Sequence, residues 1–199
     1  MKFFRVSFAY IIIKILAIFK RFRALIVLMT TGAKFKAVGT NCKVRGEGMS
    51  IGINVMIGDF SWIETIGSYA GQCFSPKLII GDEVALSDFV HISVIGRIQI
   101  GRGTLIGSKV YIGDHSHGHY RDIKIWQKEK NIIPKSRPLA DLMDIKIGDN
   151  CWIGDGVVIL AGSIIGNNCV VGANSVVKGI FQNDCIIAGM PAKIVKDLK

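Results

Sequence analysis

The stretch IKIGDNCWIGDGVVILAGSIIGNNCVVGANSVVKG, residues 145–179, decides the fold because its pattern returns every six residues. An aliphatic residue opens each repeat, at Ile147, Ile153, Ile159, Ile165, Val171 and Val177. Glycine usually follows it, and a small or β-branched residue stands four positions after it. A period of six matches neither the 3.6-residue period of an α-helix nor the two-residue period of an extended strand.

The same period continues toward the N-terminus in three further blocks. It adds nine aliphatic positions, Ile51, Ile57, Ile63, Ile80, Leu86, Ile92, Ile100, Ile106 and Ile112. Short strands joined by tight turns satisfy this pattern if the aliphatic and small residues point inward and glycine relieves crowding near each bend. Three repeats then form one triangular coil, and coils stacked about 4.8 Å apart bury an aliphatic column. The sequence therefore predicts an all-β fold, a parallel β-helix, with Cys151 and Cys169 as small core residues.

The first 29 residues have a different character. Their apolar residues are dominated by Phe3, Phe4, Phe8, Ile11, Ile12, Ile15, Leu16, Phe19, Phe22 and Ile26, and all their charges are positive. Lys14 and the basic cluster at 20–23 interrupt the run, which a spanning helix would need over about 20 residues. No small-residue cleavage site follows, which disfavours a secretory signal. Two interpretations stay open: a basic amphipathic helix on the cytoplasmic face of a membrane, or a helix packed on its own domain or on an oligomer neighbour.

Composition narrows the compartment and the partners. The formal net charge of +10 favours anionic partners, namely phosphorylated cofactors, anionic lipid or nucleic acid. The basic residues are dispersed and carry no recognition motif, which argues against nucleic acid. The five cysteines are odd in number and contain no CxxC pair, so we expect neither a disulfide framework nor a zinc site. A reducing, cytoplasmic location fits best.

Two interruptions of the repeat divide the chain. Residues 67–78 break it once, and residues 117–144 form a longer irregular insertion with Trp126, Pro134 and Pro138. Long irregular insertions in a regular solenoid are usually functional. We therefore expect a helical segment at 1–32, a β-helix at 33–180 with an inserted loop at 117–144, and a C-terminal cap at 181–199.

The segment YIGDHSHGHY, residues 111–120, precedes the long insertion and carries the candidate chemistry. His115 lies three residues after the inward Ile112, so its side chain is expected to face outward, as is that of His117. A neutral imidazole can take a proton from an alcohol near neutral pH, and acyl transfer from a thioester to a hydroxyl needs such a base together with donors for the oxyanion. Surface histidines without a role are an alternative. The 115, 117, 119 spacing is a weak metal signal, and we expect no metal.

Three motifs together carry a resemblance to a known family. DHSHG at 114–118, the repeats at 145–179 and IIAGMPAKIVK at 186–196 resemble the hexapeptide-repeat acyltransferase superfamily, in particular the O-acetyltransferases of surface polysaccharides and the galactoside and maltose acetyltransferases. The resemblance covers residues from about 50 to 199. It implies a left-handed coil, although crossovers between parallel strands are usually right-handed. It also implies a homotrimer that binds acetyl-CoA in clefts between neighbouring β-helices.

The resemblance also implies roles for individual residues. A histidine at the start of the loop is the general base, which is His115 with Asp114 before it, or else His117. The acetyl-CoA contacts are then Trp152, Asp155, Ala173, Lys178, Lys193 and Lys196. Lysines suit the phosphates of coenzyme A, and Trp152 lies beside the pantetheine channel or packs at an interface. Asp88 orients the base, binds an acceptor hydroxyl or serves as a turn carboxylate. The sequence KGIF at 178–181 replaces the family's usual Lys-Asp-Ile-Pro.

These observations lead to one main functional hypothesis and two alternatives. The main one is an acetyl-CoA-dependent O-acetyltransferase acting on a sugar hydroxyl in surface-polysaccharide or O-antigen biosynthesis. It would work in the cytoplasm, with peripheral contact to the inner face of the membrane through residues 1–29. The alternatives are an O-acetyltransferase for a small molecule such as serine or an antibiotic, and a β-helix scaffold without catalysis.

Overall fold

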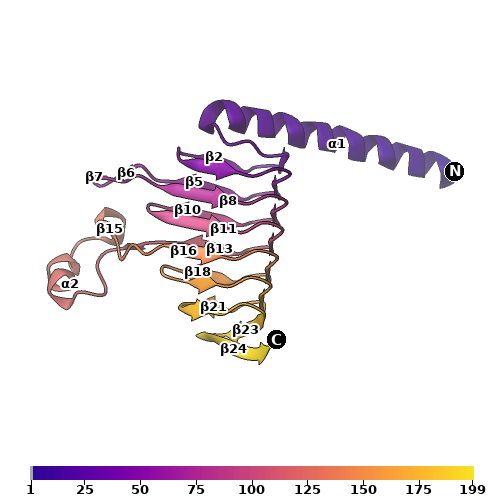
Figure 1. Cartoon of the computed structure of the whole chain (residues 1–199). Helices are drawn as coiled ribbons and strands as arrows, with labels where there is room; N and C mark the ends of the chain where they lie inside the picture. Colours follow the sequence, from indigo (N-terminus) through magenta and orange to yellow (C-terminus); the bar gives the residue numbers. More distant parts are fainter. Residues whose placement is uncertain (1) are drawn as a thin grey trace.

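The structure is a computed structural model that describes residues 2–199, with side chains described from residue 12 onward. A long N-terminal helix is followed by a stack of coils (Figure 1). The side chains of Phe3, Phe4, Phe8 and Ile11, on which the expected amphipathic helix partly rests, lie outside the described residues. Within residues 2–199, no helix has both the length and the apolar composition needed to cross a bilayer.

Three parallel sheets form the faces of the stack, and they are denoted A, B and C in the order in which the chain visits them. Sheet A contains β1 (Ala37–Val38), β4 (Met56–Ile57), β9 (Ala85–Leu86), β12 (Leu105–Ile106), β17 (Trp152–Ile153), β20 (Val170–Val171), β23 (Cys185–Gly189) and the antiparallel β24 (Ala192–Asp197). Sheet B contains β2 (Lys43–Arg45), β5 (Trp62–Thr65), β10 (His91–Val94), β13 (Tyr111–Gly113), β18 (Val158–Leu160) and β21 (Val176–Val177). Sheet C contains β3 (Met49–Ile51), β8 (Lys77–Ile80), β11 (Arg97–Ile100), β16 (Ile145–Ile147), β19 (Ile164–Ile165) and β22 (Ile180–Phe181).

The aliphatic column predicted from the repeat forms the core. In sheet B, the strand register aligns Ile63, Ile92, Ile112 and Ile159 above one another. Of the fifteen repeat positions, fourteen are at most 3% exposed, and Ile51 in the first coil is half-buried. The predicted core cysteines are buried as well, because they occupy the small inward position of the repeat. The period of six therefore identified the interior correctly.

The repeat glycines are explained by contact between coils rather than by the bend alone. A Cβ atom added to Gly148 would lie 2.5 Å from the carbonyl carbon of Gly166 in the next coil, and one on Gly101 would lie 2.4 Å from that of Gly148. Non-bonded atoms do not approach so closely. Glycine at this position therefore lets successive coils stack at strand spacing.

Helix α1 (Lys2–Thr31) lies across the N-terminal end of the stack (Figure 1). Ala24 is buried against the first coil, and Arg23 donates through Nε to the carbonyl oxygen of Val38 at 3.1 Å. Lys20 Nζ lies 3.4 Å from a carboxylate oxygen of Asp59. One face of the helix thus packs on its own domain, which was one of the two interpretations of the sequence.

Both interruptions of the repeat leave the stack at the corner between sheets B and C. The first forms a hairpin of β6 (Ser68–Tyr69) and β7 (Gln72–Cys73), and the second contains β14 (Ser116–His117), α2 (Ile123–Glu129), a 3-10 turn (Pro134–Ser136) and β15 (Leu139–Ala140). The Gln72 side chain joins them, since its Oε1 accepts from the Leu139 N–H at 2.8 Å and its Nε2 donates to the Leu139 carbonyl at 3.1 Å. Tyr69 also donates to the carbonyl oxygen of Lys135. The two insertions therefore cover one corner of the stack together.

Candidate active site

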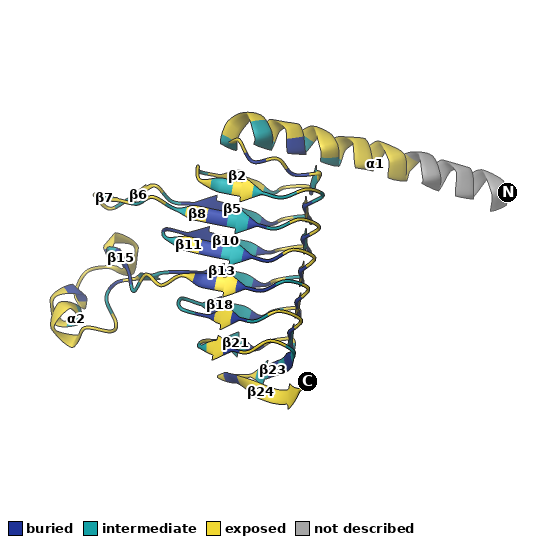
Figure 2. Ribbon diagram, in the orientation of Figure 1, coloured by how far each residue is buried: buried dark blue, intermediate teal, exposed yellow. Residues whose placement is uncertain are grey.

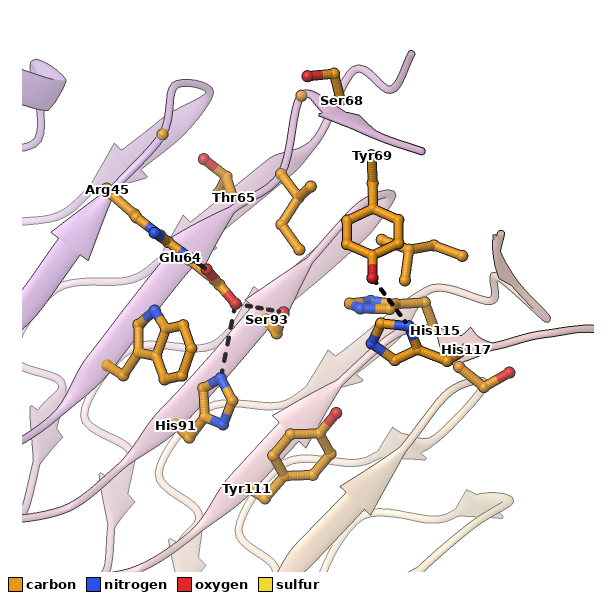
Figure 3. A pocket seen from close by; sticks show the side chains of 16 residues that line it. Arg45, Glu64, Thr65, Ser68, Tyr69, His91, Ser93, Tyr111, His115 and His117 are labelled. Atoms are coloured by element: carbon orange, nitrogen blue, oxygen red, sulfur yellow. Dashed lines mark hydrogen bonds and ion pairs between the residues drawn. The ribbon is translucent and has the colours of Figure 1, made fainter. Parts of the chain in front are cut away.

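Two grooves meet beneath these insertions. The N-side groove, of about 820 Å³, runs over the outer face of β2, β5, β10 and β13 toward the hairpin (Figure 3). The C-side groove, of about 300 Å³, is lined by Arg121, Leu160 and Lys178 among others. His115 and Ser116 line both grooves. His115 is therefore placed where two bound molecules could meet.

The orientation of His115 is fixed by the residue before it. Asp114 is fully buried, and its carboxylate accepts the backbone N–H of Ile95 at 3.0 Å and that of Gly96 at 2.8 Å, both from the preceding coil. His115 Nδ1 lies 2.9 Å from Asp114 Oδ1. An ionised carboxylate only accepts hydrogen bonds, so Nδ1 must carry a proton, and in the neutral ring Nε2 then has the free lone pair. This is the tautomer that a general base requires.

The side chain of His115 leaves the aliphatic core, as expected, but it is only 7% exposed. The reason is that the insertion folds back over this corner, where β14 and β15 pair and the Met143 N–H donates to the Asp114 carbonyl at 3.2 Å. Removal from water strengthens the interaction between the imidazole and Asp114. His115 is therefore a shielded side chain in a groove, not a solvated surface histidine.

His117 lies in the same N-side groove but has a different environment (Figure 3). It is exposed, its ring meets Tyr69 edge-on at 5.3 Å between centroids, and its Nδ1 lies 3.5 Å from the Tyr69 hydroxyl. His119 instead stabilises the insertion, because its Nδ1 lies 2.8 Å from Oε1 of Glu129 within the same insertion. Among the described side chains, no three His, Cys, Asp or Glu residues gather in a group that could hold a metal ion. Because His115 is shielded and held by Asp114, whereas His117 is exposed, the geometry favours His115 over His117 as the base.

A polar column on sheet B was missed in the sequence. Arg45, Glu64, Ser93 and Gly113 stand in register at the position where most repeats have glycine. Glu64 is 8% exposed at its side chain; it accepts from Arg45 Nε at 2.9 Å, from Arg45 Nη2 at 2.7 Å and from Ser93 Oγ at 3.2 Å. Burial opposes ionisation, but His91, whose Nε2 lies 3.8 Å from Glu64 Oε1, and the hydrogen bonds from Arg45 outweigh it and lower the pKa of Glu64 to about 2. The replacement of glycine at 45, 64 and 93 was the signal that could have identified this column.

An aromatic column runs beside the polar one. Trp62 stacks on His91 with 4.6 Å between ring centroids, and the edge of His91 meets Tyr111 at 5.3 Å. A Cβ atom on Gly113 would lie 2.2 Å from the Tyr111 hydroxyl. The phenol ring therefore lies across Gly113, and it fits there because glycine has no side chain. Burial, and then the charge of Asp114, raise the pKa of Tyr111, which keeps the hydroxyl protonated as a donor. The groove thus offers an aromatic surface, a phenol donor and a carboxylate acceptor near His115.

The residues expected to bind acetyl-CoA are divided between two faces of the chain. Lys178 lines the C-side groove together with His115. The others lie on or directly after strands β17, β20 and β24 of sheet A: Trp152, Asp155, Ala173, Lys193 and Lys196. Asp155 caps a turn by accepting the Ser108 N–H at 2.8 Å, and Trp152 is exposed. Within one chain, therefore, Lys178 is the only expected acetyl-CoA contact that lies in the same groove as His115.

Asp88 lies in an exposed turn between sheets A and B. Its Oδ1 accepts the backbone N–H of Asp59 at 2.7 Å, as a turn carboxylate does. It lines neither of the two grooves at His115. A contact between Asp88 and an acceptor stays a prediction.

The fold and this corner define the class of the protein: a β-helix of hexapeptide repeats with a histidine site at an inserted loop. Residues 144–179 match the bacterial transferase hexapeptide (six repeats) family. The structure resembles a hexapeptide-repeat acetyltransferase of Vibrio cholerae solved with acetyl coenzyme A, with 28% identity, a TM-score of 0.59, and coverage of 76% of this chain and 72% of that one. It shares its fold with a maltose O-acetyltransferase of Clostridium difficile, at 22% identity and a TM-score of 0.55 over 87% of this chain and 73% of that one.

Two curated relatives extend this similarity. A protein of Escherichia coli named for O-acetyl transfer in lipopolysaccharide biosynthesis is 45% identical over 60% of this chain. A protein of Mycobacterium tuberculosis named as a probable acetyltransferase is 31% identical over 85% of this chain. The chain spans 60% and 52% of the lengths of these two relatives. The repeats and the left-handed parallel β-helix are similar to those of hexapeptide-repeat acetyltransferases, as the resemblance of the sequence implied.

Proposed function

We propose that this chain is an acetyl-CoA-dependent O-acetyltransferase that transfers an acetyl group to a sugar hydroxyl in surface-polysaccharide or O-antigen biosynthesis. The observation that carries the proposal is the position of His115, whose Nδ1 is held by a buried carboxylate at the junction of two grooves. The names of the relatives support the same reaction and the same class of acceptor.

In this mechanism the donor and the acceptor approach His115 from opposite sides. The thioester of acetyl-CoA lies in the C-side groove by Lys178, and the sugar lies in the N-side groove. His115 Nε2 takes the proton of the sugar hydroxyl while its oxygen attacks the thioester carbonyl carbon, and backbone N–H groups stabilise the resulting oxyanion. The intermediate collapses with cleavage of the carbon–sulfur bond, and the imidazolium returns its proton to the leaving thiolate. The products are a sugar acetate and free coenzyme A.

The division of the expected donor contacts supports a homotrimer with active sites between subunits. Trp152 and Lys193, on sheet A, belong to a different face from His115. A neighbouring chain that presents its sheet A face to the C-side groove would bring both sets together around one molecule of acetyl-CoA. We also place the protein in the cytoplasm, with peripheral membrane contact through its N-terminal helix.

A thiol-release assay tests the proposed function. Purified protein with acetyl-CoA is expected to release coenzyme A on addition of sugar acceptors, and calorimetry is expected to detect acetyl-CoA binding. Release with serine or an antibiotic but with no sugar would support the small-molecule alternative. If calorimetry detected no acetyl-CoA binding, the enzyme proposal would fail and the scaffold alternative would stand.

Glu64→Gln tests the N-side groove as the acceptor site. A hydrogen bond to a charged group contributes about 1.5–3 kcal/mol, so we expect the KM for the sugar to rise by roughly tenfold or more while the KM for acetyl-CoA stays the same. Glu83→Gln, in an exposed turn on another corner, is the control. A rise in both KM values, or in neither, would argue against this assignment.

The pKa of Glu64 also predicts a pH dependence. Because this pKa is lowered to about 2, the carboxylate stays ionised throughout the pH range from 5 to 8, and Glu64 contributes no titration to the KM for the acceptor there. Its contribution to the stability of the fold is present above its ordinary pKa and is lost as the pH falls toward 2.

A further inference from the structure

Most of the described part of helix α1 is exposed (Figure 2). Lys20, Ala24 and Val27 share the face that packs on the first coil. The opposite face follows the helical period and is 46–79% exposed, at Ile15, Ile18, Phe19, Phe22, Leu25, Ile26 and Met29. A surface helix normally buries its apolar stripe against the core. Here the helix is held to its domain by polar contacts and small side chains, and the large apolar ones remain uncovered.

The charge of the helix indicates what covers this face. Residues 2–31 contain six Lys and Arg residues and no Asp or Glu, and the first acidic residue of the chain is Glu47. A helix with large apolar side chains on one side and only positive charge is suited to the interface of an anionic lipid surface.

We propose that α1 lies in the plane of an anionic membrane surface and that the stack of coils stands upright on it. The helix crosses the end of the stack (Figure 1), so a helix lying flat on the lipid directs the stack away from the bilayer. Three coil steps separate β2 from β13, which precedes His115. At about 4.8 Å per step and about 10 Å from the helix axis to the first coil, His115 stands about 24 Å from the helix axis.

This height constrains the acceptor. The constraint rests on the proposed function, because it concerns the sugar that reaches His115. A sugar attached directly to the lipid headgroup cannot reach a groove at that height. The acceptor is therefore a glycan carried on a membrane lipid, modified on a sugar separated from the lipid by further sugar units.

Vesicle flotation tests the docking face. The full chain is expected to float with vesicles of phosphatidylcholine and phosphatidylglycerol, and only weakly with phosphatidylcholine alone. Phe19→Ser combined with Phe22→Ser is expected to lower the partition constant by roughly 100-fold. The control combines Ile13→Ser and Leu16→Ser, two exposed apolar residues on the helix face that contains Lys20, and is expected to float like the wild type. Equal flotation of both variants would overturn the proposal, as would a change of oligomeric state without lipid in the phenylalanine variant alone.

Energy transfer to a headgroup dye tests the upright orientation. A donor fluorophore is attached to the exposed Cys73, near the helix end of the stack, or to Lys196→Cys in a Cys73→Ser background at the far end. Transfer is expected to be stronger from position 73 than from position 196, whereas equal transfer would mean a stack lying on its side. The phenylalanine variant should release coenzyme A normally with a water-soluble acceptor. Loss of that release as well would implicate the proposed function rather than the docking.

Discussion

Replacing His115 by alanine is expected to lower the turnover number by about 100- to 10,000-fold, which is the usual contribution of a positioned general base. The reason is geometric: His115 is the side chain whose imidazole both lines the two grooves and is held by a buried carboxylate. The measurement is the rate of coenzyme A release with saturating acetyl-CoA and sugar. Binding of acetyl-CoA, followed by calorimetry, is expected to change little.

His117→Ala is the matched control for this experiment. His117 lies in the same N-side groove, but its ring partner is the phenol of Tyr69 and its side chain is exposed. We therefore expect this variant to raise the KM for the acceptor more than it lowers turnover. If His117→Ala were inactive and His115→Ala retained nearly normal turnover, the two roles would be exchanged.

The fold could be predicted because the repeat is local. Each hexapeptide contains its own inward aliphatic residue and usually its own glycine. The residues of the core can therefore be predicted without knowledge of distant residues. The alignment of side chains on the outer face of the coils, in contrast, depends on residues far apart in the sequence. In sheet B, Trp62 is paired with His91, 29 residues later, His91 with Tyr111, 20 residues later, and Tyr111 with Val158, 47 residues later. The two insertions lengthen the first and the third of these steps, so the columns on the outer face become visible only in three dimensions.

The candidate site shows the same limit. His115 could be found because it follows the repeat at the start of the insertion, and Asp114 because it stands beside His115. The reason why Asp114 matters could not be found, since its carboxylate is held by the backbone of Ile95 and Gly96, about one coil away in the sequence. The direction in which the apolar stripe of the N-terminal helix faces could not be predicted, for a related reason. Its sequence contains an apolar stripe, but only the packing of Ala24 on the coil reveals that the stripe faces outward.

Asp114→Asn separates the charge of this carboxylate from its shape, and we expect it to lower turnover by roughly 100- to 10,000-fold. All three partners of Asp114 donate hydrogen bonds to it: the Ile95 and Gly96 N–H groups and His115 Nδ1. An asparagine has one oxygen that accepts and one amino group that only donates. If its oxygen takes the place of Oδ2 and keeps the Gly96 N–H, its amino group takes the place of Oδ1 and faces His115 Nδ1, which must then accept. The proton of the neutral ring moves to Nε2, and that nitrogen can no longer take a proton from the sugar.

The alternative orientation of the amide has a different signature. An amino group in the place of Oδ2 leaves the Gly96 N–H unpaired, while the oxygen keeps the Ile95 N–H and His115 Nδ1, so the tautomer of His115 is retained. Either orientation leaves one buried backbone N–H unpaired, at a cost of about 1–3 kcal/mol, which denaturant unfolding would detect as lost stability. Asp88→Asn is the matched control, because Asp88 lies in an exposed turn and accepts a single N–H, which an amide oxygen can also do. We expect that variant to keep both stability and turnover. Low turnover in the folded Asp114→Asn variant would assign the carboxylate to the tautomer of His115, whereas normal turnover in that variant would contradict this assignment.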